Sequence, residues 1–253
     1  MLDSVSILNE NMQRYLYADL YNLEETHWWH KAKRDLVSYF LEKYLFKKDN
    51  EILDVGCGTG KNIESFSKYG IVWGIDSSYD AINFCKKRGL KNIVKGSIEK
   101  IPFKNMSFEC VTALDVLEHV NDSRSLKEIH RVLKKGGFLI ATVPAFPLLW
   151  SKWDEVLHHK RRYTKNTLTS VLERNGFIII KMSYCYSFLF LPSLIIRVLK
   201  GMIYKNYYPS DFLISNKITN IIGGKISELE KFFITYVTVP FGTSLIAVVL
   251  KDK

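Results

Sequence analysis

The 253-residue chain has few cysteines, and they are scattered. Three of the four fall in or beside strand-like segments, and no two are close enough in sequence to suggest a metal-binding pair. This pattern argues against both a disulfide framework and a zinc site. We therefore expect no metal ligands and four reduced, buried thiols, at Cys57, Cys85, Cys110 and Cys185.

The sequence also lacks a long apolar run. Its most apolar window, residues 186–199, is interrupted by Pro192 and Arg197 and is shorter than the roughly twenty residues that a membrane-spanning helix needs. Near the amino terminus, Asp3 and Glu10 stand where a secretory signal would be basic and then apolar. We expect a cytoplasmic protein, with peripheral contact at the inner membrane surface as an open alternative.

Acidic residues are outnumbered by basic ones, 26 against 36, which gives a net charge of +10. This excess favours anionic partners such as phosphorylated substrates or lipid head groups, although a solvated, lysine-rich surface explains it equally well. No RNA-binding module is visible, so nucleic acid is the weaker expectation. The length suits one elaborated α/β domain.

The most informative feature is an apolar, strand-like run that ends in a glycine-rich loop, Gly56-Cys57-Gly58-Thr59-Gly60. Glycine is favoured where the backbone takes positive φ or approaches a ligand closely. Asp76 follows a second strand-like run about twenty residues later, where a carboxylate can accept hydrogen bonds from both ribose hydroxyls. The two features together predict a nucleotide-type cofactor site.

The glycine spacing discriminates between cofactors. A dinucleotide fingerprint places its third glycine three residues after the second. Here that position is Lys61, and the glycine comes one residue earlier. An NAD site is therefore the weaker interpretation.

Strand and helix signals alternate from residue 50 onward, which indicates a parallel α/β sheet. The turn 134–137 is expected to end a helix and reverse the chain before an apolar strand over 138–143. The last two strands are separated by about sixty residues, too many for an ordinary connection. Within this insertion, residues 214–233 show helical spacing of apolar residues, with a break expected at Gly223-Gly224; the helix would cover the site, touch a membrane or pack on the core.

The loop 54–60, together with 95–103, 113–120 and 131–137, resembles the cofactor motifs of the class I S-adenosylmethionine (SAM) methyltransferases. The segments 25–34, 150–154 and 158–164 resemble a bacterial and archaeal subgroup found with glycan or lipid biosynthesis genes and distantly similar to quinone O-methyltransferases. The resemblance implies a Rossmann-like, seven-stranded α/β sheet with helices on both faces and an antiparallel last strand. We expect a helical cap (1–48), the SAM-binding core (49–185), a helical insertion or lid (186–242) and the final strand (243–253).

The resemblance also implies which residues bind SAM. Ser97 replaces the acid that usually contacts adenine, and its hydroxyl can still form a hydrogen bond there. Trp29 lies where an indole face can attract the sulfonium, or it anchors the first helix in the core. The full expected set is Asp54, Gly56, Cys57, Gly58, Gly60, Asp76, Ser77, Ser97, Ile98, Leu114, Asp115, His119 and Trp29.

Methyl transfer from SAM needs alignment of donor and acceptor above all, because the sulfonium already activates the methyl group. For a hydroxyl acceptor a base adds a further factor, and His119 and His159 are the candidates. The basic residues beside His159 are expected to keep an imidazole neutral and to offer guanidinium forks to an acidic acceptor. The expected acceptor-binding residues are Trp150, Asp154, His158, Arg161, Arg162 and Tyr163.

The sequence thus predicts a SAM-dependent methyltransferase that acts on oxygen of a small polar, glycosidic or lipid-linked acceptor. One alternative is an NAD-dependent oxidoreductase, which the glycine spacing disfavours. The other is a non-catalytic protein that keeps the fold and uses its basic, aromatic loops to bind a membrane or a partner.

Overall fold

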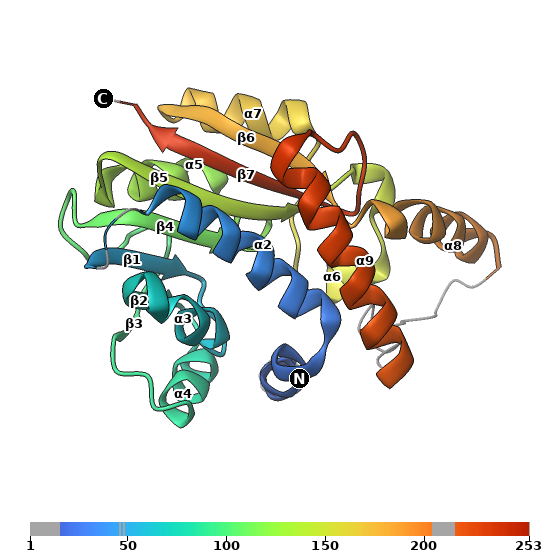
Figure 1. The fold of residues 1–253 in the computed structure, drawn as a ribbon, viewed down its shortest axis with the longest axis horizontal. Coiled ribbons are helices and arrows are strands. Elements are labelled where there is room, and N and C mark those ends of the chain that lie inside the picture. Colours follow the sequence, from blue (N-terminus) through green and yellow to red (C-terminus); the bar gives the residue numbers. More distant parts are fainter. Residues whose placement is uncertain (1–15, 46, 48, 204–215, 253) are drawn as a thin grey trace, which may run out of the picture.

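The computed structural model describes residues 16–45, 47, 49–203 and 216–252. Its centre is a seven-stranded sheet with the order β3-β2-β1-β4-β5-β7-β6 (Figure 1). Neighbouring strands are parallel except where β7 pairs antiparallel with β5 and β6. The strands are β1 (Asn50–Val55), β2 (Gly70–Asp76), β3 (Ile93–Lys95), β4 (Phe108–Leu114), β5 (Leu133–Pro144), β6 (Phe177–Cys185) and β7 (Ser244–Lys251).

Helices cover both faces of the sheet. One core joins the sheet to α5 and α7, and the other joins it to α2, α3 and α9 (Figure 1). Residues 16–26 form a further helix before α2. The α-helices that follow are α2 (Trp28–Tyr44), α3 (Lys61–Phe66), α4 (Tyr79–Lys87), α5 (Asp122–Val132), α6 (Lys152–Val156), α7 (Lys165–Arg174), α8 (Phe190–Ile203) and α9 (Lys217–Tyr236).

The predicted fold is confirmed. Central strands such as β4 and β5 are buried along nearly their whole length, as continuous apolar runs of parallel sheets require. β7 lies between β5 and β6 although the long insertion separates it from β6 in sequence. The antiparallel direction of β7 is the one that the resemblance implied.

The turn predicted at residues 134–137 is wrong in detail. The structure continues β5 through these residues, from Leu133 to Pro144. The register with β4 shifts here, because Leu133 pairs with Phe108 and Phe138 pairs with Cys110. Gly136, at φ +73°, supplies the left-handed residue of this bulge. The glycines therefore lie in a bulge at the start of β5. α5 ends before them, at Val132.

The insertion also departs from expectation, because α9 runs unbroken through Gly223-Gly224. A Cβ on Gly223 would lie 2.6 Å from the ring of Trp28, so the missing side chain lets α9 approach α2 closely. Further along, the Glu230 carboxylate accepts hydrogen bonds from the backbone N–H groups of Tyr186 and Ser187, each at 2.6 Å. Glycine here serves helix packing and does not break the helix.

The four cysteines are buried and free, as predicted. Among the described residues, no helix is both long and apolar enough to cross a bilayer.

Candidate active site

A cavity of about 1750 Å³ opens where the parallel strands end. Its floor comes from the residues that follow β1, β2, β4 and β5. Its walls come from the helix over residues 16–26, from α2, from the segment 150–162 and from the start of α8. Ligands of open α/β sheets bind at this edge, so the cavity is the candidate active site.

The glycine loop has the backbone conformation that its sequence predicts. Gly56, Gly58 and Gly60 have φ values of +67°, +55° and +86°. A Cβ on Gly56 would come within 2.5 Å of Val116, so no larger residue fits without a shift. The N–H groups of Gly56 and Cys57 donate to the carbonyl of Ile75, which holds the loop against β2. The loop is a fixed cradle for a ligand that approaches the backbone.

Asp76 ends β2 beside this loop. One carboxylate oxygen accepts from the N–H of Gly58 at 3.0 Å and the other from the N–H of Ser78 at 2.9 Å. Burial raises its pKa from the ordinary value, while these backbone hydrogen bonds oppose the shift. A carboxylate has about four acceptor sites, so two remain for a pair of hydroxyls in the cavity. These contacts fit the ribose of SAM.

Most of the predicted cofactor residues line the cavity, but two do not. Gly60 is the N-cap residue of α3, and Asp54 lies beneath the floor with 1% of its surface exposed. The Asp54 carboxylate accepts a hydrogen bond from the Thr112 hydroxyl at 2.6 Å, which joins β1 to β4. The predicted residues that line the cavity are Gly56, Cys57, Gly58, Asp76, Ser77, Ser97, Ile98, Leu114, Asp115, His119 and Trp29.

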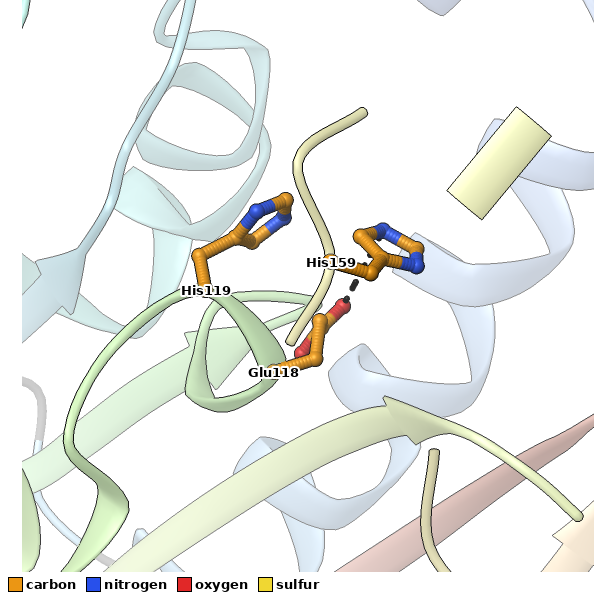
Figure 2. A group of neighbouring side chains, drawn as sticks. All are labelled: Glu118, His119 and His159. Carbon is orange, nitrogen blue, oxygen red and sulfur yellow. Dashed lines mark ion pairs between the residues drawn. The ribbon is translucent and has the colours of Figure 1, made fainter. Parts of the chain in front are cut away.

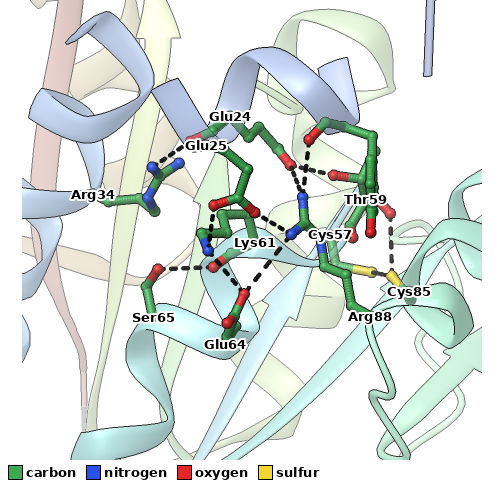
Figure 3. Close-up of polar contacts among 12 residues, drawn as sticks. Glu24, Glu25, Arg34, Cys57, Thr59, Lys61, Glu64, Ser65, Cys85 and Arg88 are labelled. Atoms are coloured by element: carbon green, nitrogen blue, oxygen red, sulfur yellow. Dashed lines mark hydrogen bonds and ion pairs between the residues drawn. The ribbon is translucent and has the colours of Figure 1, made fainter. Parts of the chain in front are cut away.

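The helix over residues 16–26 is fastened across the glycine loop, as Figure 3 shows. Arg88 donates to the carbonyl of Thr59 at 2.8 Å and forms ion pairs with Glu24 and Glu25. The Thr59 hydroxyl donates to the Glu24 carboxylate. Because Glu24 and Arg88 are both largely buried, this network fixes the helix as a wall of the cavity.

A second charged contact lies at the end of β4. Asp115, at φ +55°, accepts from Lys33 of α2 and from the Thr142 hydroxyl at 2.8 Å. Burial alone would raise the pKa of Asp115, but the charge of Lys33 and the hydrogen bonds from Lys33 and Thr142 together outweigh it, and the pKa is lowered. Lys33 also lies 3.7 Å from the ring centroid of Trp29. Trp29 therefore packs on a cation of the protein and contributes to the cavity wall.

The two candidate histidines meet on the opposite wall. The rings of His119 and His159 pack edge to face with centroids 4.7 Å apart. Burial, then the neighbouring His159, lowers the pKa of His119 to about 4. His159 Nδ1 lies 2.8 Å from a carboxylate oxygen of Asp154. A carboxylate only accepts, so Nδ1 of His159 carries a proton.

The predicted acceptor residues separate into two groups. Trp150, His158 and Arg162 line the cavity together with His159. Arg161 instead pairs with Asp122 at 2.8 Å, and the Tyr163 hydroxyl donates to the same residue at 3.0 Å. Arg161 and Tyr163 are therefore not placed to contact a ligand.

Asp154 is fully buried behind the wall, where Arg162 donates to both of its oxygens at 2.7 and 3.1 Å. It does not line the cavity, and it contacts two residues that do, His159 and Arg162.

Sequence reasoning missed Lys33, Glu118 and the attachment of the helix over residues 16–26, part of the expected helical cap, to the glycine loop. Lys33 stands four residues after Trp29, so both lie on one helix face, and this spacing was a usable signal. Glu118 directly precedes His119, but nothing local indicates that its carboxylate is buried. The contacts of Glu24 with Thr59 and Arg88 bridge distant segments, which spacing alone does not reveal.

Comparisons with known proteins agree with this geometry. A methyltransferase-domain family matches residues 53–141. An uncharacterized protein of Methanocaldococcus jannaschii is 32% identical over 158 residues, which cover 62% of this chain and 67% of that protein. The ubiquinone biosynthesis O-methyltransferase of Coxiella burnetii is 33% identical over 107 residues, covering 40% of this chain and 46% of that enzyme.

A solved SAM-dependent methyltransferase of Thermotoga maritima has the same fold, with a TM-score of 0.60 and 16% identity over 96% of this chain and 99% of that one. The fold and cavity thus define a Rossmann-like protein with a nucleotide-type cofactor site. The chain belongs to the class I SAM-dependent methyltransferases. SAM is the methyl donor of this family, which decides against the NAD alternative.

Proposed function

We propose that this chain methylates a hydroxyl oxygen of a small polar, glycosidic or lipid-linked acceptor by direct in-line transfer. The observation that carries the proposal is that one cavity holds both parts of the required machinery. The glycine loop and Asp76 form the cofactor side, and His119 and His159 form the wall where a hydroxyl must lose its proton.

Bound SAM supplies an electrophilic methyl group on a sulfonium, so the residues mainly position the two reactants. The glycine loop and Asp76 bind and orient the nucleoside. The Lys33–Asp115 pair, beside Trp29, fixes the floor between this side and the histidine wall. On that wall, the two histidines promote deprotonation of the acceptor hydroxyl, and Asp154 keeps His159 oriented.

The cavity mouth supports an acceptor with an apolar part. Leu189, Pro192 and Ile196 line it from the start of the insertion, opposite the polar residues of the 150–162 segment. Among the described residues, the cavity lining includes the start of α8 and no residue of α9. The start of α8 is therefore the part of the insertion that covers the cavity. An acceptor with a polar head and an apolar tail matches this division, as in lipid-linked glycans.

The insertion also supports a peripheral membrane contact. α9 exposes Ile221, Leu229, Phe232 and Phe233, each with about half or more of its surface accessible, and α8 exposes Leu191. Lysines are interspersed on α9. Apolar side chains beside basic ones are the composition that binds anionic lipid surfaces.

Calorimetric titration with SAM, S-adenosylhomocysteine and NAD tests the cofactor side. We expect micromolar binding of the first two and none of NAD. Asp76→Ala should weaken SAM binding about 30-fold or more, because two hydrogen bonds to a carboxylate are lost, on the order of 2–4 kcal/mol. Unchanged affinity in this variant would remove Asp76 from the ribose site.

The acceptor side is tested with His159→Ala and a panel of hydroxylated glycans and lipids, by following formation of S-adenosylhomocysteine. We expect the variant to bind SAM normally and to lose about 100-fold or more in turnover. Wild-type turnover in His159→Ala would show that the histidine wall is not the reacting side.

A further inference from the structure

Glu118 carries a fully buried carboxylate beside the two histidines of the cavity wall. It lies in the short helix Leu117–His119 that follows β4, with 0% of its surface exposed. Within the described part of the chain, neither carboxylate oxygen accepts a hydrogen bond. A buried carboxylate is unfavourable unless it is protonated or meets a positive charge. The side chain nevertheless borders the cavity.

The cationic side chains near Glu118 form ion pairs with other acidic residues. Lys33 binds Asp115, and Arg162 binds Asp154 through two hydrogen bonds. Lys33 and Arg162 are the two cations whose charges act on Glu118, and each of them is paired with another acid. Neither cation donates a hydrogen bond to Glu118.

Two imidazoles face this carboxylate, as Figure 2 shows. His159 Nε2 lies 4.0 Å from a Glu118 oxygen, and one nitrogen of His119 joins them, so that all three donor atoms lie within 4.8 Å of one another. Nδ1 of His159 is held by Asp154, and Nε2 is the ring nitrogen that lies nearer to Glu118. A carboxylate that orients a histidine from behind is the usual support of a metal-bound imidazole.

These distances suit a cation between the three side chains. Ligand atoms about 2.1 Å from a metal lie roughly 3–4 Å apart. Side-chain movements of about 1 Å would therefore bring the three ligand atoms from their observed separations into this range. Two imidazoles and one carboxylate favour a divalent transition metal over Mg²⁺ or Ca²⁺, and three protein ligands leave positions open for substrate.

We propose that Glu118, His119 and His159 bind a divalent transition-metal cation that holds the acceptor hydroxyl. The catalytic part of this inference rests on the proposed methyl transfer to oxygen; the binding part does not. The hydroxyl oxygen coordinates the cation and releases its proton to solvent water. The same oxygen then bonds to the methyl carbon of SAM while the carbon–sulfur bond breaks, so a methyl ether, S-adenosylhomocysteine and one proton are formed. The two histidines thus promote deprotonation through the metal.

The test measures metal binding without activity. Protein stripped with a chelator is titrated with Co²⁺, whose visible absorption reports the number and type of ligands, and separately with SAM. We expect one saturable Co²⁺ site in the wild type. Glu118→Gln, which keeps the shape but removes the charge, should weaken Co²⁺ binding at least tenfold while circular dichroism and SAM binding stay unchanged.

His130→Gln provides the matched control, because His130 packs on Phe177 and does not line the cavity. This variant should bind Co²⁺ like the wild type. If Glu118→Gln does not fold, His119→Asn gives the same comparison. The metal site is overturned if the wild type binds no Co²⁺ below millimolar concentration, or if a folded ligand variant binds it as tightly as the wild type.

The two titrations separate this inference from the proposed function. SAM binding without Co²⁺ binding removes the metal and leaves the methyltransferase proposal standing. Co²⁺ binding that Glu118→Gln abolishes, in protein that does not bind SAM, supports the metal site and contradicts the methyl-transfer proposal.

Discussion

Asp54 belongs to the cofactor motif at residues 54–60 and yet lies outside the cavity. Its carboxylate is buried below the cavity floor, where Thr112 donates to it. Burial raises the pKa of Asp54 to about 7, despite the hydrogen bond from Thr112. The residue therefore supports the glycine loop from beneath, and its charge state is coupled to folding.

This coupling has a definite sign. The folded-state pKa lies above the ordinary value of 3.8, so the folded protein holds a proton that the unfolded chain loses. The resulting stability is present below about pH 4 and is lost as the pH rises to about 7. Asp54→Asn mimics the protonated form, so its free energy of unfolding relative to the wild type should rise by roughly 1–3 kcal/mol between pH 5 and pH 8.

Urea denaturation of both proteins at the two pH values measures this difference. Glu155→Gln, at an exposed helix position, controls for the loss of one negative charge. Parallel pH profiles for Asp54→Asn and the wild type would contradict a raised pKa.

At the residue scale, the cofactor side was largely predictable and the acceptor side was not. Gly56, Gly58 and Asp76 belong to two neighbouring strand ends, so their sequence spacing already places them together. Arg161 and Arg162 are adjacent in sequence but bind different acids, Asp122 and Asp154. That division depends on the local path of an irregular segment, which no periodicity encodes.

At the scale of elements, the alternation of strands and helices was predictable because apolar runs and glycine stops are local signals. The packing of the insertion was not, because it depends on surfaces that meet only in the fold. The glycine pair of α9 illustrates this, since it was expected to break the helix. In the structure, Gly223 faces Trp28 while Gly224 faces open space.

The glycine pair offers an internally controlled test. Gly223→Ala should destabilise the protein by about 1–3 kcal/mol, because its Cβ would lie 2.6 Å from the Trp28 ring and push α9 from α2. Gly224→Ala meets nothing within 4 Å and should stabilise the helix by up to about 1 kcal/mol. Chemical denaturation compares the two variants. Equal effects would mean that α9 does not rest on Trp28.

At the scale of the whole molecule, the proposed membrane contact combines a net charge of +10 with the exposed apolar side chains of α9. Electrostatic attraction weakens as salt rises, whereas apolar insertion does not. We expect sedimentation with vesicles that contain anionic lipid to be strong at low salt and reduced, but not abolished, at high salt.

Replacing both Phe232 and Phe233 with Ser should remove the salt-resistant fraction of vesicle binding. Ile178→Ser is the matched control, because Ile178 is also half exposed but lies on β6, away from the insertion. If the double variant sediments like the wild type at both salt concentrations, the insertion is not the membrane contact.

The position of β7 has a consequence for how the chain reaches its fold during synthesis. β5 finds its antiparallel partner only when Ser244–Lys251 has been made, long after β5 itself. Until then two apolar strands, β5 and β6, have unpaired edges that face one another. Pairing over such a sequence separation is slow and leaves an intermediate prone to aggregation. The nascent chain therefore closes its sheet only after Ser244–Lys251 has left the ribosome.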